Sequence, residues 1–198
     1  MNAGFCGHPL NMSGGSGWTN YPTGHWGGEL RYTVSPALTL QTAVFQVNPE
    51  YNSRSSEAFS MTTKGTTGAI MPLEAIFTNN AWLNGQYKVG WYYDTSNTRK
   101  IGSTQKANNR TGAYVLVDQA IWRDEQDPES VLRAFGQASS SNAATSPMRH
   151  WYSVGLVKQK PFASRPKDSI AFAYGRAVFN SRSRDVQEAA ASSPEQAD

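Results

Sequence analysis

Apolar and polar residues alternate along about eight segments of the chain. A side-chain period of two is typical of a β-strand with one apolar and one polar face. The pattern therefore predicts eight strands, with turns or loops between them. They cover residues 26–34, 37–47, 69–78, 86–94, 111–124, 130–139, 151–159 and 169–179.

The connections between the first strands alternate between short and long. Ser35 and Pro36 form a tight turn, whereas residues 48–68 and 95–111 are long and polar. Outer-membrane barrels have short periplasmic turns and longer extracellular loops. The alternation of short and long connections between strands predicts an all-β protein, an antiparallel up-and-down transmembrane β-barrel. A soluble β-sandwich with an aromatic core is the alternative.

Two strands separate their faces most clearly. In residues 26–34, Leu30 and Tyr32 share the apolar face, and in residues 86–94 Val89 and Trp91 do so. Residues 37–47 and 169–179 do not resolve into two clean faces. Pro72 lies inside a strand and lacks an N–H for the ladder, which predicts a bulge or an edge there.

Charged residues on the polar faces are the candidates for lining a pore. Asp118 and Gln119 are adjacent and face opposite ways, and the carboxylate is costlier to place in an apolar medium, so Asp118 is assigned to the polar face. Rings of polar and charged side chains set the selectivity of pores, and mixed signs suit a neutral, hydroxyl-rich solute. The candidates are Glu29, Arg31, Glu74, Lys88, Asp118 and Arg133.

The amino-acid composition is consistent with a β-barrel and argues against a helical membrane protein and a nucleic-acid-binding protein. Hydrophobic residues make up 38% of the 198-residue chain, and no run approaches the ~18 apolar residues of a spanning helix. Aromatic residues reach 12%, which suits the interfacial girdles of a barrel. A net charge of +3 without a basic stripe gives no support to nucleic-acid binding.

The residues show no pattern that binds a metal or cofactor. Cys6 is the single cysteine, and the three histidines, His8, His25 and His150, have no metal-ligand spacing. Residues 2–20 are rich in Gly, Asn and Ser and lack a secretory signal pattern. Together with the strand rhythm, this predicts an interior portion of a longer protein.

Ordered motifs along the chain resemble the carbohydrate-selective porins of the OprB family. They extend over residues 5–180, and the resemblance rests on their succession. The motifs are YPTGHWG at 21–27, TLQTAVFQVNP at 39–49, GQYKVGWYYDT at 85–95, GAYVLVDQ at 112–119, WR at 122–123, SVGLV at 153–157, RPKD at 165–168 and AYGR at 173–176.

The resemblance implies an outer-membrane barrel of ~16 strands that passes sugars by passive diffusion, is surrounded by outer-membrane lipid and forms a homotrimer when complete. This chain would supply about half of the strands. The predicted organisation is a loop over residues 1–25, a partial barrel over residues 26–180, and a polar loop or disordered tail over residues 181–198.

Two other functions use the same residues. A soluble carbohydrate-binding module would bury Tyr87, Val89, Trp91 and Tyr93 against a second sheet, whereas a porin would expose them to lipid. A glycoside hydrolase needs two carboxylates within ~10 Å across a cleft, and no spacing motif favours a pair. The expectation is therefore a transport channel and not an enzyme.

Overall fold

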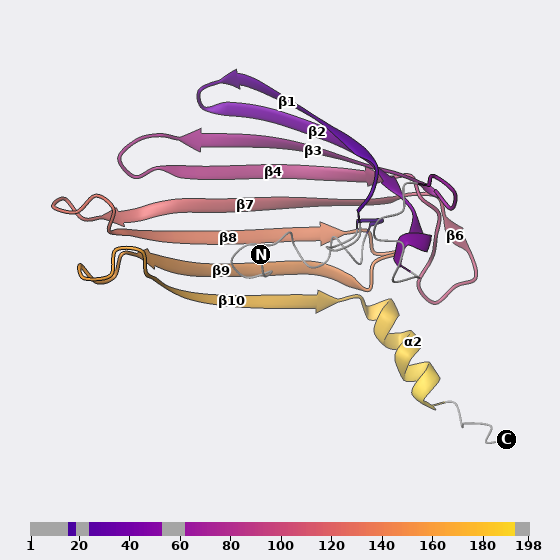
Figure 1. Ribbon diagram of the computed structural model, residues 1–198. Helices are drawn as coiled ribbons and strands as arrows, with labels where there is room; N and C mark the ends of the chain where they lie inside the picture. Colours follow the sequence, from indigo (N-terminus) through magenta and orange to yellow (C-terminus); the bar gives the residue numbers. More distant parts are fainter. Residues whose placement is uncertain (1–15, 19–23, 53–61, 193–198) are drawn as a thin grey trace.

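The computed structural model describes residues 16–18, 24–52 and 62–192, and one large sheet dominates it (Figure 1). The strands β5 and β6 form a separate two-stranded ribbon, and η1 is a short 3-10 helix. The elements are β1 (Gly27–Ser35), β2 (Leu38–Val47), η1 (Pro49–Asn52), β3 (Gly68–Asn79), β4 (Gly85–Asp94), β5 (Thr98–Arg99), β6 (Lys106–Ala107), β7 (Arg110–Arg123), β8 (Val131–Ser141), β9 (Met148–Gln159), β10 (Ser169–Phe179) and α2 (Ser181–Ser192).

The sheet is an antiparallel meander. Its eight strands follow the order β1-β2-β3-β4-β7-β8-β9-β10, so each strand pairs with the next long strand of the chain. All eight predicted strands are confirmed, with ends shifted by at most a few residues. In the described part of the chain, β1 and β10 each pair on one side only. The sheet is therefore open at both edges.

The predicted alternation of short and long connections holds only for the first half of the sheet. Residues 95–109 between β4 and β7 are long, but residues 142–147 between β8 and β9, at the same end of the sheet, are short. At the opposite end, residues 36–37 join β1 to β2, whereas residues 160–168 join β9 to β10. We call these ends the loop rim and the turn rim.

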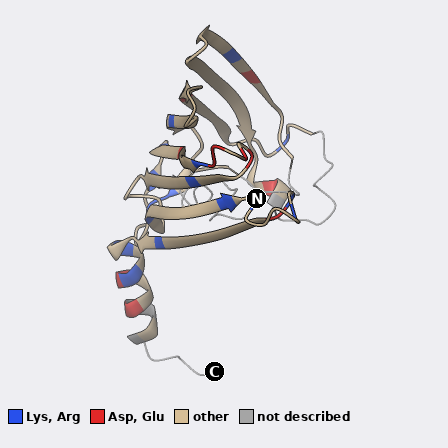
Figure 2. Cartoon of the chain, turned by 90° about the vertical axis from the view of Figure 1, so that its left-hand side faces the viewer, with Lys and Arg blue, Asp and Glu red and all other residues tan. Residues whose placement is uncertain are grey.

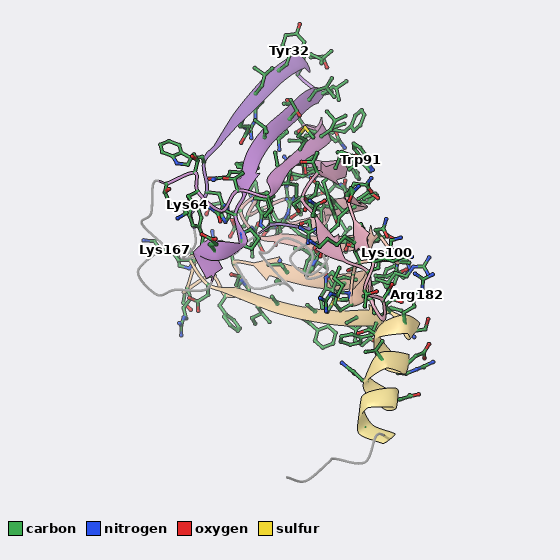
Figure 3. The ribbon with its side chains drawn as sticks, turned by 90° about the vertical axis from the view of Figure 1, so that its right-hand side faces the viewer. Tyr32, Lys64, Trp91, Lys100, Lys167 and Arg182 are labelled. Atoms are coloured by element: carbon green, nitrogen blue, oxygen red, sulfur yellow. The ribbon has the colours of Figure 1, made fainter. Side chains whose placement is uncertain are left out.

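Strand pairing places side chains on two distinct faces of a curved sheet. Figure 3 looks along the strands and shows Trp91 on the convex side. The register aligns Glu74 with Gly90, and Gly90 with Tyr114, on the concave face. Leu73, Trp91 and Ala113 form a row on the convex face. A period of two therefore gives each strand one concave and one convex set of residues.

Large apolar side chains cover the convex face and remain exposed. Val89 is 52% exposed, Leu73 is 55% exposed and Val154 is 59% exposed. Aliphatic residues occupy the strand centres, while Trp122 lies near the turn rim and Trp91 near the loop rim. An apolar band with aromatic residues at both borders is the pattern of a lipid-facing barrel wall.

A small hydrophobic core lies on the concave face near the loop rim. Val47, Ile70 and Tyr92 are buried there, and the partly buried Trp18 and Phe45 pack against them. The rings of Trp18 and Phe45 meet edge to face, with centroids 5.4 Å apart. Residues that precede β1 therefore contribute to the interior of the curved sheet.

The prediction of a bulge or an edge at Pro72 is wrong. Strand β3 is internal, and its register with β2 does not shift: Thr42 pairs with Leu73 and Phe45 pairs with Ile70. The ladder is interrupted between these two pairs, where Pro72 lacks an N–H. The Thr42 hydroxyl donates to the Pro72 carbonyl over 2.8 Å and bridges the interruption.

The prediction of a polar loop or disordered tail after residue 180 is wrong for α2. The side chain of Asn180 accepts a hydrogen bond from the backbone N–H of Arg182 and caps the helix. Arg184 and Glu188 form an i,i+4 ion pair at 3.6 Å, and alanines with high helix propensity follow. None of the described helices is long and apolar enough to cross a membrane.

We predict that Val89→Arg destabilises a complete barrel containing this chain by about 2–4 kcal/mol in lipid, because the charge would face the apolar band. Unfolding in denaturant from lipid vesicles measures the change. Gln86→Arg, on the concave face of the same strand, is the matched control and is expected to change stability little. Equal destabilisation by both variants would contradict the assignment of faces.

The turn-rim ion pairs predict a pH dependence. Lys160 Nζ lies 2.6 Å from Asp127 and 3.2 Å from Glu129. The hydrogen bond from Lys160 lowers the pKa of Asp127, and the hydrogen bonds to both carboxylates raise the pKa of Lys160. Their stabilising effect is present at neutral pH. It is lost as pH falls through the lowered pKa of Asp127, and as pH rises through the raised pKa of Lys160.

We therefore expect Asp127→Asn to lower the unfolding midpoint at pH 7. At a pH low enough to protonate Asp127, we expect the variant and the unaltered protein to have the same midpoint. The measurement is the midpoint as a function of pH. Glu125→Gln is the control, since Glu125 lies in the same turn and makes no ion pair within the described residues. A difference that persisted after protonation of Asp127 would refute the assignment.

Candidate functional site

All six predicted pore-lining residues lie on the concave face. Arg31 pairs with Gln41, which pairs with Glu74, so β1, β2 and β3 bring these three residues into one row. The six come from five strands: Glu29 and Arg31 from β1, Glu74 from β3, Lys88 from β4, Asp118 from β7 and Arg133 from β8. The polar faces inferred from the alternation are those that the register brings together.

The six residues form three ion pairs. Arg31 lies 3.5 Å from Glu29, and Lys88 lies 3.8 Å from Glu74. Arg133 donates from Nε to Asp118 over 2.6 Å and from Nη1 to the Asn84 amide oxygen over 3.0 Å. Figure 2 shows a blue and a red position next to one another on β1, the uppermost strand. The concave face therefore carries charge of both signs in close pairs.

Glu74 is the central residue of this face. Only 7% of its surface is exposed. One carboxylate oxygen accepts from Gln41 Nε2 over 2.8 Å, and the other accepts from the Tyr114 hydroxyl over 2.7 Å. Burying a carboxylate is costly unless hydrogen bonds replace its water. Gln41, Tyr114 and Lys88 supply these partners from three neighbouring strands.

Tyr114 reaches Glu74 because Gly90 leaves space for its ring. A Cβ added at Gly90 would overlap the Tyr114 ring, and one added at Gly112 would overlap the Tyr92 ring. Each tyrosine therefore lies flat over a glycine of the neighbouring strand. Tyr92 is 1% exposed, and its hydroxyl lies 3.0 Å from that of Ser141. It packs in the core and offers no open face to a ligand.

A cavity of about 220 Å³ opens beside Glu74. Two carboxylates, Glu29 and Glu74, share it with the side chain of Gln41 and with aromatic rings. Its walls include Trp18, Glu29, Gln41, Phe45, Glu74 and Tyr114. Carboxylate and amide groups bind sugar hydroxyls, and an aromatic ring can cover the apolar face of a sugar. The cavity therefore offers both kinds of contact within one site.

A buried ion pair fixes the segment that carries Trp18. Asp94 is fully buried and lies 2.7 Å from Arg110 Nη2. The same carboxylate accepts hydrogen bonds from the backbone N–H groups of Ser96 and Gly17. Asp94 therefore joins the end of β4 to residues 16–18 and holds Trp18 against the cavity.

Sequence reasoning missed four of the six wall residues named above: Trp18, Gln41, Phe45 and Tyr114. Gln41 lies in the segment whose faces did not resolve, Tyr114 was not chosen as a site residue, and Trp18 was assigned to a loop. Their placement depends on the register and on the contact of residues 16–18 with the sheet. Among the described residues, no group of three or more His, Cys, Asp or Glu side chains could hold a metal ion.

Comparison with known proteins decides the family. The family model described as carbohydrate-selective porin, OprB family, matches residues 1–197. The chain belongs to the OprB family of carbohydrate-selective porins. It is an outer-membrane protein, and the eight strands of its large sheet form part of a porin wall.

Two curated relatives and two solved structures resemble the chain. QuiX of Acinetobacter baylyi, named as a porin, is 30% identical over 94% of this chain, and Porin B of Pseudomonas aeruginosa is 27% identical over 91%. The chain covers 44% and 43% of their lengths. The high-pH structure of Pseudomonas putida OprB is 28% identical, with a TM-score of 0.83 over 90% of this chain and 45% of that one. The low-pH structure has a TM-score of 0.54 at 24% identity, over 78% of this chain and 40% of that one, and supports the fold.

The soluble binding module is the alternative that these findings exclude. It required Val89 and Trp91 to be buried against a second sheet, but they are 52% and 47% exposed. The other described strands, β5 and β6, have two residues each and are too short to form a second sheet over the convex face. Family membership and exposed apolar residues both agree with a wall that faces lipid.

The dependence of Glu74 on Gly90 gives a stability prediction. We expect Gly90→Ala to displace Tyr114, break its hydrogen bond to Glu74 and cost about 1–3 kcal/mol. Stability is measured by unfolding a chimera in which this chain replaces the matching segment of Porin B. Gly136→Ala is the control, because its nearest atom would be 3.8 Å away. Equal effects of the two variants would contradict the account.

Proposed function

We propose that this chain forms one side of a sugar-conducting pore, through which neutral carbohydrates pass by passive diffusion without chemical change. The observation that carries the proposal is the concave face itself. Three ion pairs balance its charge, and beside them the cavity at Glu74 combines carboxylates, an amide and aromatic rings. Membership of a carbohydrate-selective family supports the choice of solute.

Paired charges suit a neutral solute better than a ring of one sign. A ring of one sign would attract counter-ions, whereas adjacent opposite charges largely cancel at a distance. Close to the wall, each pair still offers donors from Arg or Lys and acceptors from Asp or Glu. A sugar hydroxyl both donates and accepts, so it can bind at each pair. The six residues Glu29, Arg31, Glu74, Lys88, Asp118 and Arg133 are proposed to form a polar path along the wall.

The cavity beside Glu74 is the proposed position of closest sugar contact. Its two carboxylates accept hydrogen bonds from hydroxyls, and Gln41 supplies an amide between them. Trp18, held through Gly17 and Asp94, provides a ring at its edge. A weak site of this kind admits the sugar and releases it, which diffusion through a pore requires.

We also propose that the complete barrel is a homotrimer embedded in outer-membrane lipid. The family resemblance supports the trimer, and the exposed convex face of the sheet supports the lipid contact. Light scattering of the detergent-solubilised Porin B chimera measures the mass. A trimer mass supports the assembly, and a monomer mass at all detergent concentrations would contradict it.

Sugar flux through the chimera tests the path. We predict that Arg31→Ala and Arg133→Ala alter flux of a neutral monosaccharide without unfolding the protein, because both belong to ion pairs with at least one exposed partner. Glu74→Gln is expected to raise the half-saturating sugar concentration about threefold to tenfold, through loss of a charged acceptor. Flux is measured by swelling of vesicles that contain the protein.

Two controls make the flux result specific. Glu125→Gln changes a carboxylate in the turn after β7 and is expected to leave flux unchanged. Heat-modifiable migration on a gel shows that each variant still forms a closed barrel. Unchanged flux for both arginine variants would remove them from the path, and an unchanged half-saturating concentration for Glu74→Gln would remove the cavity as the contact site.

A further inference from the structure

The convex face carries positive charge and no described carboxylate. The acidic residues of the long strands, Glu29, Glu74, Asp94 and Asp118, all lie on the concave face by register. Arg176 and Lys158 are on the convex face, where they pair with Tyr152 and Ile170. Lys158 lies at the turn rim, 4.0 Å over the Trp122 ring. Arg176 lies toward the loop rim.

A shallow hollow lies on the convex side at the loop rim. One row of the register contains Trp91, Ala113, Ser140 and His150, in that order across β4, β7, β8 and β9. The two small residues, Ala113 and Ser140, follow the Trp91 ring in this row, and all three line a hollow of about 360 Å³. Ser140, Asn142 and Arg149 also line it and place polar groups at its upper edge.

An irregularity in the ladder brings Arg149 to this hollow. The register between β9 and β10 shifts at this point, so that His150 pairs with Val178 and Met148 pairs with Phe179. The register with β10 skips Arg149, which lies between these two pairs. A bulge of this kind re-aims a side chain, and Arg149 lines the same hollow as Trp91.

Arg176 on β10 is a second cation of the convex face, and it lies farther from the loop rim than Arg149 does. Its partner Tyr152 is two residues from His150, and the rings of Tyr152 and His150 stack with centroids 6.2 Å apart. Arg176 is exposed, and no described carboxylate forms an ion pair with it. Its neighbours on the same face, Phe172 and Tyr174, are 75% and 61% exposed. A cation among lipid-facing apolar residues is costly unless an anion meets it.

We propose that Arg149 and Arg176 bind the phosphate groups of an acylated glycolipid in the outer leaflet of the membrane. The long β4–β7 connection is at this rim, and long loops face the cell exterior in outer-membrane barrels. Arginine binds phosphate through paired, charge-assisted hydrogen bonds. Ser140 and Asn142 line the hollow and supply further donors to the phosphate.

The surface below the hollow fits the acyl chains of the same molecule. Below the hollow, the convex side of β8 presents three small residues, Ala138, Gly136 and Ala134, before Leu132 near the turn rim. Larger side chains flank this strip, with Val115 on β7 and Val154 on β9. The small side chains of this strip begin below the proposed phosphate site and continue toward the membrane centre, where acyl chains would lie.

Lipid binding by the purified Porin B chimera tests this site. The probes are bisphosphorylated lipid A and the same lipid after removal of both phosphates, added to the protein in neutral detergent. Binding is measured by native mass spectrometry at low and high salt. We expect the Arg149→Gln, Arg176→Gln double variant to weaken binding of the bisphosphorylated probe about tenfold or more, and to leave binding of the dephosphorylated probe unchanged.

Lys158→Gln is the matched control, because it removes a convex cation at the opposite rim. It is expected to retain full binding, and each single arginine variant is expected to show an intermediate loss. Equal binding of the two probes, or equal loss in the double variant and in Lys158→Gln, would overturn the proposal. Sugar flux and heat-modifiable migration are measured on the same variants, so a failure of the pore is distinguished from a failure of the lipid site.

Discussion

The separation of the two faces is the constraint on which the rest of this structure depends. Backbone groups within the membrane must find partners in the strands themselves, so the wall is built from long antiparallel ladders. Because the ladders pair the backbone groups in the same way on both faces, only the side chains determine which face meets lipid and which meets water. Because the period is two, adjacent residues such as Lys88 and Val89 meet different solvents, and each position of the wall is committed to one of them.

The polar face is stabilised by contacts that cross several strands. Glu74 illustrates this, since its carboxylate depends on Gln41 from β2, Lys88 from β4 and Tyr114 from β7. The space for Tyr114 depends in turn on Gly90. A polar group that is nearly excluded from water is thereby satisfied beside a cavity. The same arrangement leaves oxygen and nitrogen atoms positioned to bind a sugar.

Much of this architecture could be predicted from the sequence, because alternation is a local signal. The strands and the faces of Glu29, Arg31 and Asp118 follow from residue order alone. The pairing of Arg133 with Asp118 does not, because it depends on the register of two separate strands. Neither does the position of Trp18, which is held through Asp94 far along the chain. The helix α2 was missed because its cap, Asn180, precedes a segment in which Val186 is the one large apolar residue, so no apolar periodicity marks a helix.

The convex and concave faces also divide the functions proposed for the wall. Charge pairs on the concave face act on a solute in water, while Arg149 and Arg176 at the loop rim of the convex face act on lipid. Each function uses side chains that the other face cannot reach, so substitutions on one face are expected to leave the other function intact. The division follows from the alternation rather than from separate domains.

The most direct measurement is thiol accessibility at two neighbouring positions. Lys88→Cys and Val89→Cys are introduced separately into the Porin B chimera with Cys6 replaced by Ser, and the barrels are assembled in lipid vesicles. A water-soluble, membrane-impermeant maleimide is then added. The account predicts rapid labelling at position 88 and protection at position 89 until detergent is added. Labelling of position 89 with protection of position 88 would contradict it.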